Sequence, residues 1–408
     1  MYVRSVFNNA VQGCQKGIVE MKEMHKQRNS NIELLRIIAM FMIIASHYPH
    51  GLSGTDLGYG ANRYFYSIFT AFGQVGVGIF LLIMGYFMID QKMTLKRFLR
   101  LYLDVICYSI VVFVLFAAFG RQYITLKLIL KSFLPLLYVN WWYFTTYVII
   151  MLFSPWLNKM LKSLEIDEYK KLIVDLVVVF TVSRFAYGSL SDSFSGFAFG
   201  KLIPCFNLYV IGAYLKLWHD QPHITRGGGH QSSINCSRFQ FLLHKVFGAD
   251  GKVKKNILLS TIGLLLYVGI IGTVIFAGHF LNVEKLMQKY SYFVVLESPF
   301  VVFIVYELFL VAIKSKPFFT PFINKVASST FGIYLIHEHQ LMAVWLFPVL
   351  LKNVELYQTK WFIPSAIASV VVVFIVCSII DLLRQKLLSG VKEKVISWID
   401  SRYSLINH

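Results

Sequence analysis

The stretch RNSNIELLRIIAMFMIIASH, residues 28–47, is apolar enough to cross a bilayer, yet it carries an arginine and a histidine. At about 100° per residue, Arg36 and His47 differ by roughly 20° around a helix and by about 16 Å along it. Titratable groups kept inside a membrane usually face a polar interior and serve a ligand. We therefore predict that Arg36 and His47 share one functional face at two depths. The alternative is that Arg36 extends to a lipid headgroup and His47 lies at the far interface.

The rest of the chain repeats such apolar runs. Hydrophobic residues make up 57% of the 408, against about 45–50% in soluble domains. A spanning helix needs about 20 residues, and the runs predict an all-α fold, a polytopic transmembrane helix bundle of about ten spans. These are expected at 31–48, 66–89, 99–119, 141–158, 171–187, 199–217, 257–278, 291–313, 329–350 and 361–383.

The net charge of +18 follows the predicted topology. The tails and alternate loops hold 28 of the Lys and Arg residues, whereas the opposite loops hold eight. By the positive-inside rule both termini are cytoplasmic. We predict a tail (1–28), a transmembrane domain (29–384) with a cytoplasmic loop (216–255), and a second tail (385–408). No basic and aromatic pattern on a soluble domain favours nucleic acid as a partner.

Neither disulfides nor a metal site is expected. The five cysteines form no C-x-x-C motif and no paired framework, so we expect free thiols. His219 and His223 have a helical i, i+4 spacing but no matching second pair, which favours a solvated linker over a metal site.

Two short segments carry candidate binding residues. Arg97 and Arg100 are one helical turn apart and are able to face one anion. Arginine suits phosphate through its rigid fork, although ordinary cytoplasmic arginines would give the same pattern. Trp142 and Tyr143 open a predicted helix and are either interfacial aromatic residues or a stacking surface for a sugar.

Further ionisable residues approach the predicted depth of His47. They are Glu297, Arg184 and the pair His337 and Glu338. Several such groups in one bundle argue for a polar cavity. The alternative is that they form hydrogen bonds that only fix helix packing.

Four of these stretches, in this order, resemble the membrane acyltransferase type 3 family. The likeness lies in Glu33-Leu-Leu-Arg36 with His47, in the glycine-rich segment 72–80 with Gly85-Tyr86-Phe87, in Arg97-Phe-Leu-Arg100, and in Phe331-Gly-Ile-Tyr334-Leu-Ile-His337. Trp142-Tyr143 also fits an aromatic pair of the family. The glycines themselves predict close helix packing. The likeness covers residues 28 to 384, while the 1–27 extension and the 216–255 loop depart from the pattern.

The resemblance implies an O-acyltransferase of the cell membrane, expected to be bacterial. It would move an acyl group, expected to be acetyl, from cytoplasmic acyl-CoA to a hydroxyl of a surface or lipid-linked polysaccharide. Arg97 and Arg100 would hold the CoA phosphates and Arg36 would receive the pantetheine arm, without any metal. Trp142, Tyr143 and Arg184 would contact the acceptor.

His47 is the expected general base, because histidine titrates near working pH. An acyl-histidine intermediate stays open. Either Glu297 or His337 with Glu338 would orient the ring. The main alternative function is a transporter or flippase of a surface glycan, which would have no use for acyl-CoA. A glycan polymerase is disfavoured because large outer loops are missing.

Overall fold

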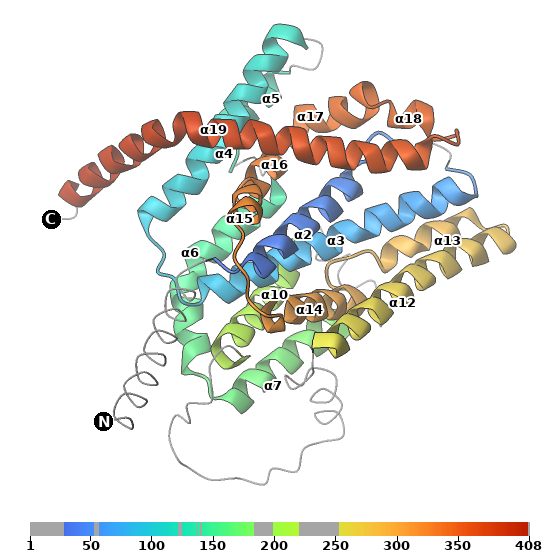
Figure 1. Cartoon of the computed structure of the whole chain (residues 1–408), viewed down its shortest axis with the longest axis horizontal. Helices are drawn as coiled ribbons and strands as arrows, with labels where there is room; N and C mark the ends of the chain where they lie inside the picture. The colour runs from blue at the N-terminus through green and yellow to red at the C-terminus, as the bar shows by residue number, and fades with distance from the viewer. Residues whose placement is uncertain are drawn as a thin grey trace, which may run out of the picture.

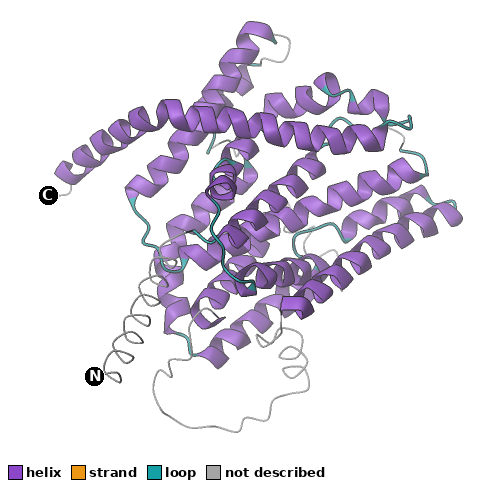
Figure 2. Cartoon of the chain, in the orientation of Figure 1, coloured by secondary structure: helices purple, strands orange, loops and turns teal. Residues whose placement is uncertain are grey.

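The computed structural model describes residues 28–52, 57–120, 125–136, 138, 141–182, 199–219 and 253–406. Every regular element in these ranges is a helix (Figure 2). The all-α prediction is therefore confirmed for the described part of the chain. Arg184, His223 and most of the 216–255 loop lie outside the described residues.

The helices follow one another in chain order, with three π-helical segments (η2, η3, η5) and one 3-10 segment (η4) among them (Figure 1). They are α2 (Ser30–His47), α3 (Ala61–Met88), α4 (Leu95–Phe119), α5 (Leu126–Phe133), α6 (Trp142–Ser163), α7 (Ile166–Val177), η2 (Val178–Val182), α10 (Phe199–Tyr214), η3 (Leu215–His219), α12 (Val253–Phe280), α13 (Glu284–Gln288), η4 (Lys289–Tyr292), α14 (Pro299–Lys314), α15 (Pro321–Ala327), α16 (Thr330–His337), α17 (Gln340–Trp345), η5 (Leu346–Leu350), α18 (Asn353–Leu356) and α19 (Phe362–Ile406).

Five described helices, α2, α3, α4, α12 and α19, are long and apolar enough to cross a membrane. A sixth candidate is the bent pair formed by 321–337 and 340–350, whose halves meet at 68°. These helices are those of an integral membrane protein. The number of ten spans stays a prediction.

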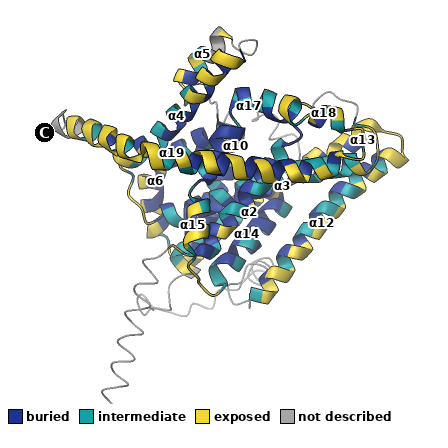
Figure 3. Ribbon diagram, turned by 45° about the horizontal axis from the view of Figure 1, so that its top comes forward, coloured by how far each residue is buried: buried dark blue, intermediate teal, exposed yellow. Residues whose placement is uncertain are grey.

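The centre of the bundle is the packed pair α2 and α3. Both helices are largely buried, whereas α12 and α19 expose one face along their length (Figure 3). A side chain on Gly76 would meet the Ala39 carbonyl, and one on Gly73 would meet Ser46. Gly85 of α3 is equally close to the backbone of Tyr209 in α10. The prediction that the glycines permit close helix packing is confirmed.

The region expected to form one helix at 329–350 is broken, and that expectation was wrong. α16 ends at His337, and His339 has an extended backbone with φ −58° and ψ 136°. The His339 side chain accepts a hydrogen bond from the Leu341 amide and so caps the N-terminus of α17. The bend places Glu338 between the two helices. A second difference is that α14 begins at Pro299 rather than near 291, with proline in the first turn.

An ionic network fastens α19 to α4. Arg384 of α19 pairs with Asp381 on its own helix and with Asp104 of α4. Asp104 also accepts from Lys392 at 2.7 Å, and Tyr108 donates to Asp381 at 2.6 Å. Two acids and two bases thereby neutralise one another in a largely buried place.

Candidate active site

His47 is the last residue of α2, and the turn that follows it is tied down. Asn353 of α18 donates to the backbone carbonyls of Tyr48 and His50. Gly51 has φ +90°, a conformation that glycine adopts without strain, and a side chain there would meet Pro348 of η5. The end of α2 therefore has one fixed position against the chain around residue 350.

The imidazole of His47 meets two groups at the end of α16. Its Nδ1 lies 3.1 Å from Nε2 of His337 and 2.9 Å from Oε2 of Glu338. His337 is fully buried, whereas the side chains of His47 and Glu338 are 18% and 19% exposed. The site is therefore buried at His337 and accessible at His47 and Glu338.

The hydrogen bonds determine where the protons lie. Nδ1 of His337 lies 2.6 Å from the Ile333 carbonyl, which can only accept, so this nitrogen carries the hydrogen. Nε2 of the neutral His337 ring then presents a lone pair to His47. Because Nδ1 of His47 faces that lone pair and a carboxylate, it must be the donor. The lone pair of His47 is therefore on Nε2, where a neutral imidazole accepts a proton.

The Glu338 carboxylate acts on His47 through its charge. Oε2 of Glu338 lies 2.9 Å from Nδ1 of His47, and Nε2 of His337 lies 3.1 Å from the same nitrogen, so the two acceptors share one hydrogen. A carboxylate at 2.9 Å stabilises the imidazolium that forms when His47 takes up a proton.

A second histidine, His50, stacks on His47 with ring centroids 5.1 Å apart. Its Nδ1 is buried and has no partner within the described part of the chain. Burial, and then the nearby His47, lower the pKa of His50 below its usual value. The ring is therefore neutral at pH 7.

Arg36 lies on the same unbroken helix as His47, at its other end. The closest oxygen of Glu33 is 3.8 Å from its Nε, and Nε has no hydrogen-bond acceptor among the described residues. The guanidinium lies 5.7 Å from the ring centroid of Phe87. Arg36 therefore retains a free donor for an anion.

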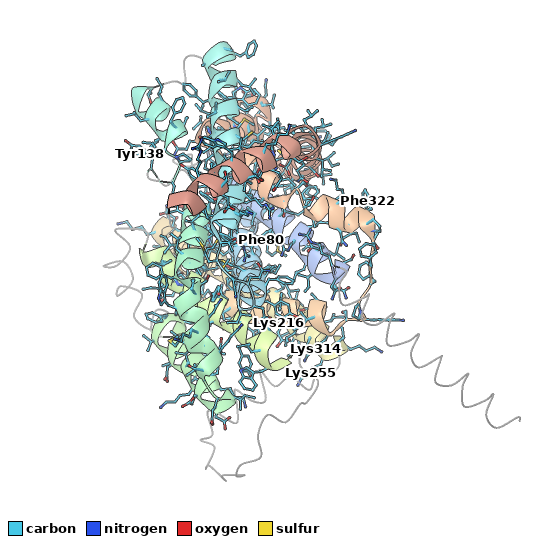
Figure 4. The ribbon with its side chains drawn as sticks, turned by 90° about the vertical axis from the view of Figure 1, so that its left-hand side faces the viewer. Phe80, Tyr138, Lys216, Lys255, Lys314 and Phe322 are labelled. Carbon is cyan, nitrogen blue, oxygen red and sulfur yellow. The ribbon has the colours of Figure 1, made fainter. Side chains whose placement is uncertain are left out.

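Lys216 is a residue of this end that the sequence did not single out. Its ammonium lies 5.0 Å from the ring centroid of Tyr86, which neighbours Phe87. Figure 4 shows Lys216, Lys255 and Lys314 gathered at one end of the bundle. In the sequence Lys216 was one of many positive-inside residues, and nothing distinguished it from the others.

The structure separates the two arginines of α4. Nε and Nη2 of Arg100 donate to the carboxylate of Glu393 in α19, both at 3.0 Å, and this pair is exposed. Arg97 instead lies within electrostatic reach of Tyr209 in α10. Tyr209 belongs to the helix whose backbone approaches Gly85 of α3.

Two tyrosines lie between the Arg36 end and the His47 end. Tyr143 of α6 is within electrostatic reach of Arg36 and contacts Tyr334 with ring centroids 5.9 Å apart. Tyr334 is 6% exposed and lies 6.4 Å from the His337 ring. Trp142 packs edge-on against Tyr143. Tyr143 therefore lies inside the bundle, with Arg36 in its surroundings and with Tyr334 between it and His337.

The carboxylate beside His47 is one of the two that the sequence offered. Glu297 lies half-buried in the turn before α14, and the carboxylate that meets His47 is that of Glu338. Arg184 lies outside the described residues.

Comparison with known proteins gives one finding. The model of a family described as an acyltransferase domain matches residues 29–382, which is most of the chain and includes every element described above except the end of α19. No curated protein and no solved structure matches the chain.

Proposed function

Because this chain belongs to the acyltransferase 3 family of membrane acyltransferases, we propose that it transfers an acyl group, expected to be acetyl, from cytoplasmic acyl-CoA to a hydroxyl of a surface or lipid-linked polysaccharide. The observation that carries this proposal is the contact of His47 with His337 and Glu338 at one end of a helix that carries Arg36 at the other.

His47 is the general base of the proposed reaction. Nε2 takes the proton of the acceptor hydroxyl as that oxygen attacks the thioester carbonyl. The carbon–sulfur bond then breaks, the CoA thiolate leaves, and the imidazolium returns the proton to the sulfur. Glu338 favours the cationic ring during this step, and His337 holds the ring in orientation. An acyl-histidine intermediate would use the same nitrogen as nucleophile.

The donor enters at the Arg36 end. Arg36, Arg97 and Lys216 supply positive charge to the CoA phosphates, since guanidinium groups pair well with phosphate oxygens. Arg100 joins them by exchanging its exposed partner Glu393 for a phosphate. This orientation puts both termini and the 216–255 loop in the cytoplasm, in agreement with the charge asymmetry.

The pantetheine arm then spans the distance of about 16 Å between the levels of Arg36 and His47. Tyr143 and Tyr334 line this passage. The Tyr334 hydroxyl lies close to the backbone of Tyr143 and Phe144, and its hydrogen is able to bond an amide oxygen of the arm. We therefore reassign Tyr143 from the acceptor to the donor. Trp142 and Arg184 stay our candidates for acceptor binding.

The experiment that tests this proposal supplies purified protein in proteoliposomes with radiolabelled acetyl-CoA and an extract of surface glycan. An acyltransferase incorporates label into glycan and releases CoA at the same rate. A glycan transporter, which remains the alternative function, would move glycan across the vesicle membrane and release no CoA. Glycan that crosses the vesicle membrane without taking up any label would therefore overturn the proposal.

A further inference from the structure

One atom beside His47 lacks the partner that a buried polar atom normally has. Nδ1 of His50 has no hydrogen-bond partner among the described residues, while Oε2 of Glu338 lies 2.9 Å from a His47 Nδ1 that also faces His337. Buried polar atoms are nearly always paired, so an unpaired one indicates an unaccounted ligand or a functional role. The proposed reaction uses the charge of Glu338 and makes no use of His50.

The three side chains are placed for a shared ligand. One ligand-type atom from each of His47, His50 and Glu338 lies within 4.8 Å of the other two. Tetrahedral zinc with bonds of about 2.0–2.2 Å holds its ligand atoms about 3.3 Å apart. Binding of the ion would draw the three atoms from within 4.8 Å to that spacing by rotation of the His50 ring and of the Glu338 carboxylate. All three side chains are partly exposed, so an ion has access to them.

We propose that His47, His50 and Glu338 form an inhibitory binding site for a divalent transition cation of the zinc class. Two imidazole nitrogens and one carboxylate oxygen are a donor set that zinc prefers, whereas magnesium and calcium prefer oxygen alone. Water completes the fourth position. The bonds come from His47 and His50, three residues apart, and from Glu338 at the bend after α16.

Inhibition follows from the proton positions and rests on the proposed function of His47. An ion at Nδ1 displaces the hydrogen of that nitrogen, so the neutral ring carries its hydrogen on Nε2. An ion at Nε2 occupies the lone pair directly. Either mode removes the lone pair that accepts the substrate proton, and it also takes the carboxylate that stabilises the imidazolium.

Cobalt binding tests the site without reference to activity. Full-length protein purified through a tag without histidines is treated with EDTA, passed into EDTA-free buffer and titrated with Co²⁺, whose visible absorption reports nitrogen and oxygen ligands. Zn²⁺ is then added in competition. We expect one Co²⁺ per chain, displaced by Zn²⁺, and at least tenfold weaker binding in His50→Ala and His50→Gln. The matched control is His279→Ala, an exposed histidine stacked on Tyr59, which leaves binding unchanged.

Acyl transfer is measured on the same samples. We expect EDTA-treated protein to be active, Zn²⁺ to inhibit it, and His50→Ala to be active and at least tenfold less sensitive to Zn²⁺. Absence of stoichiometric Co²⁺ binding, or binding that is as tight in both His50 variants as in the wild-type protein, would overturn the proposal. So would activity that EDTA abolishes and Zn²⁺ restores, because the ion would then be a cofactor. If no acyl transfer is detected at all, the proposed function fails and the Co²⁺ titration still decides the metal site.

Discussion

Nδ1 of His47 lies 3.1 Å from Nε2 of His337, although 290 residues separate the two in the chain. The contact joins the last residue of α2 to the last residue of α16. It depends on the bend after His337, because a continuous helix would carry Glu338 on past the end of α2. The bend thus brings a carboxylate to the ring that would take the proton.

Glu338→Gln tests which carboxylate serves His47. We expect acyl transfer to fall by at least about tenfold, since the amide cannot stabilise the imidazolium as the carboxylate does. The measurement is kcat with saturating acyl-CoA. Glu297→Gln is measured beside it, and Glu355→Gln, at an exposed carboxylate paired with Lys352, is the control that should leave kcat near the wild-type value. An equal loss in Glu297→Gln, with Glu338→Gln active, would return the orienting role to Glu297.

Arg36→Ala and Arg97→Ala test the donor site. Each should raise KM for acyl-CoA by about tenfold, because a hydrogen bond to a charged group contributes about 1.5–3 kcal/mol. Arg100→Ala should raise it less, because Arg100 already has a partner in Glu393. Lysine at these positions should rescue only partly, since the planar fork is lost. Initial rates over a range of acyl-CoA concentrations provide the values. An unchanged KM in Arg36→Ala and Arg97→Ala would show that acyl-CoA does not bind at the Arg36 end of the bundle.

Arg384→Ala tests the ionic network between α4 and α19. The substitution leaves Asp381 and Asp104 with too little positive charge in a buried place, so we expect a loss of about 3–5 kcal/mol in stability. Lys96→Ala is the control, because Lys96 pairs with Asp400 across the same two helices at an exposed position. Thermal unfolding in detergent should show a clear drop in Tm for Arg384→Ala alone. Equal Tm values in the two variants would contradict the network's role.

Reporter fusions test the orientation on which the donor route depends. Fusions after residues 95, 165, 235 and 395 should report cytoplasm, and fusions near 55, 192 and 355 the outside. A cytoplasmic signal at 192 would overturn the ten-span topology.

The sequence was sufficient for features that depend on local periodicity. The placement of Arg36 and His47 on one helix could be predicted because α2 is unbroken from Ser30 to His47. The role of the glycines could be predicted because a helix without a side chain at Gly76 permits close approach whatever its partner is.

Features that depend on distant partners were not predictable in the same way. The break after His337 has no proline or glycine at the bend, and it is fixed by the capping of α17 by His339. Glu338 was one of two candidates for the carboxylate beside His47, and only the three-dimensional packing separates it from Glu297. Lys216 shows the same limit, because a lysine after an apolar helix satisfies the positive-inside rule without any ligand.

His47→Gln tests whether His47 is the proton acceptor of the reaction. Glutamine keeps much of the size and the hydrogen bonding of histidine but cannot take up the proton. Single-turnover transfer from labelled acetyl-CoA, with donor binding measured separately, should show unchanged binding and a rate lower by about 10²- to 10⁴-fold. Near-normal transfer in His47→Gln would show that His47 is not the base and would leave that role to His337 or Glu338.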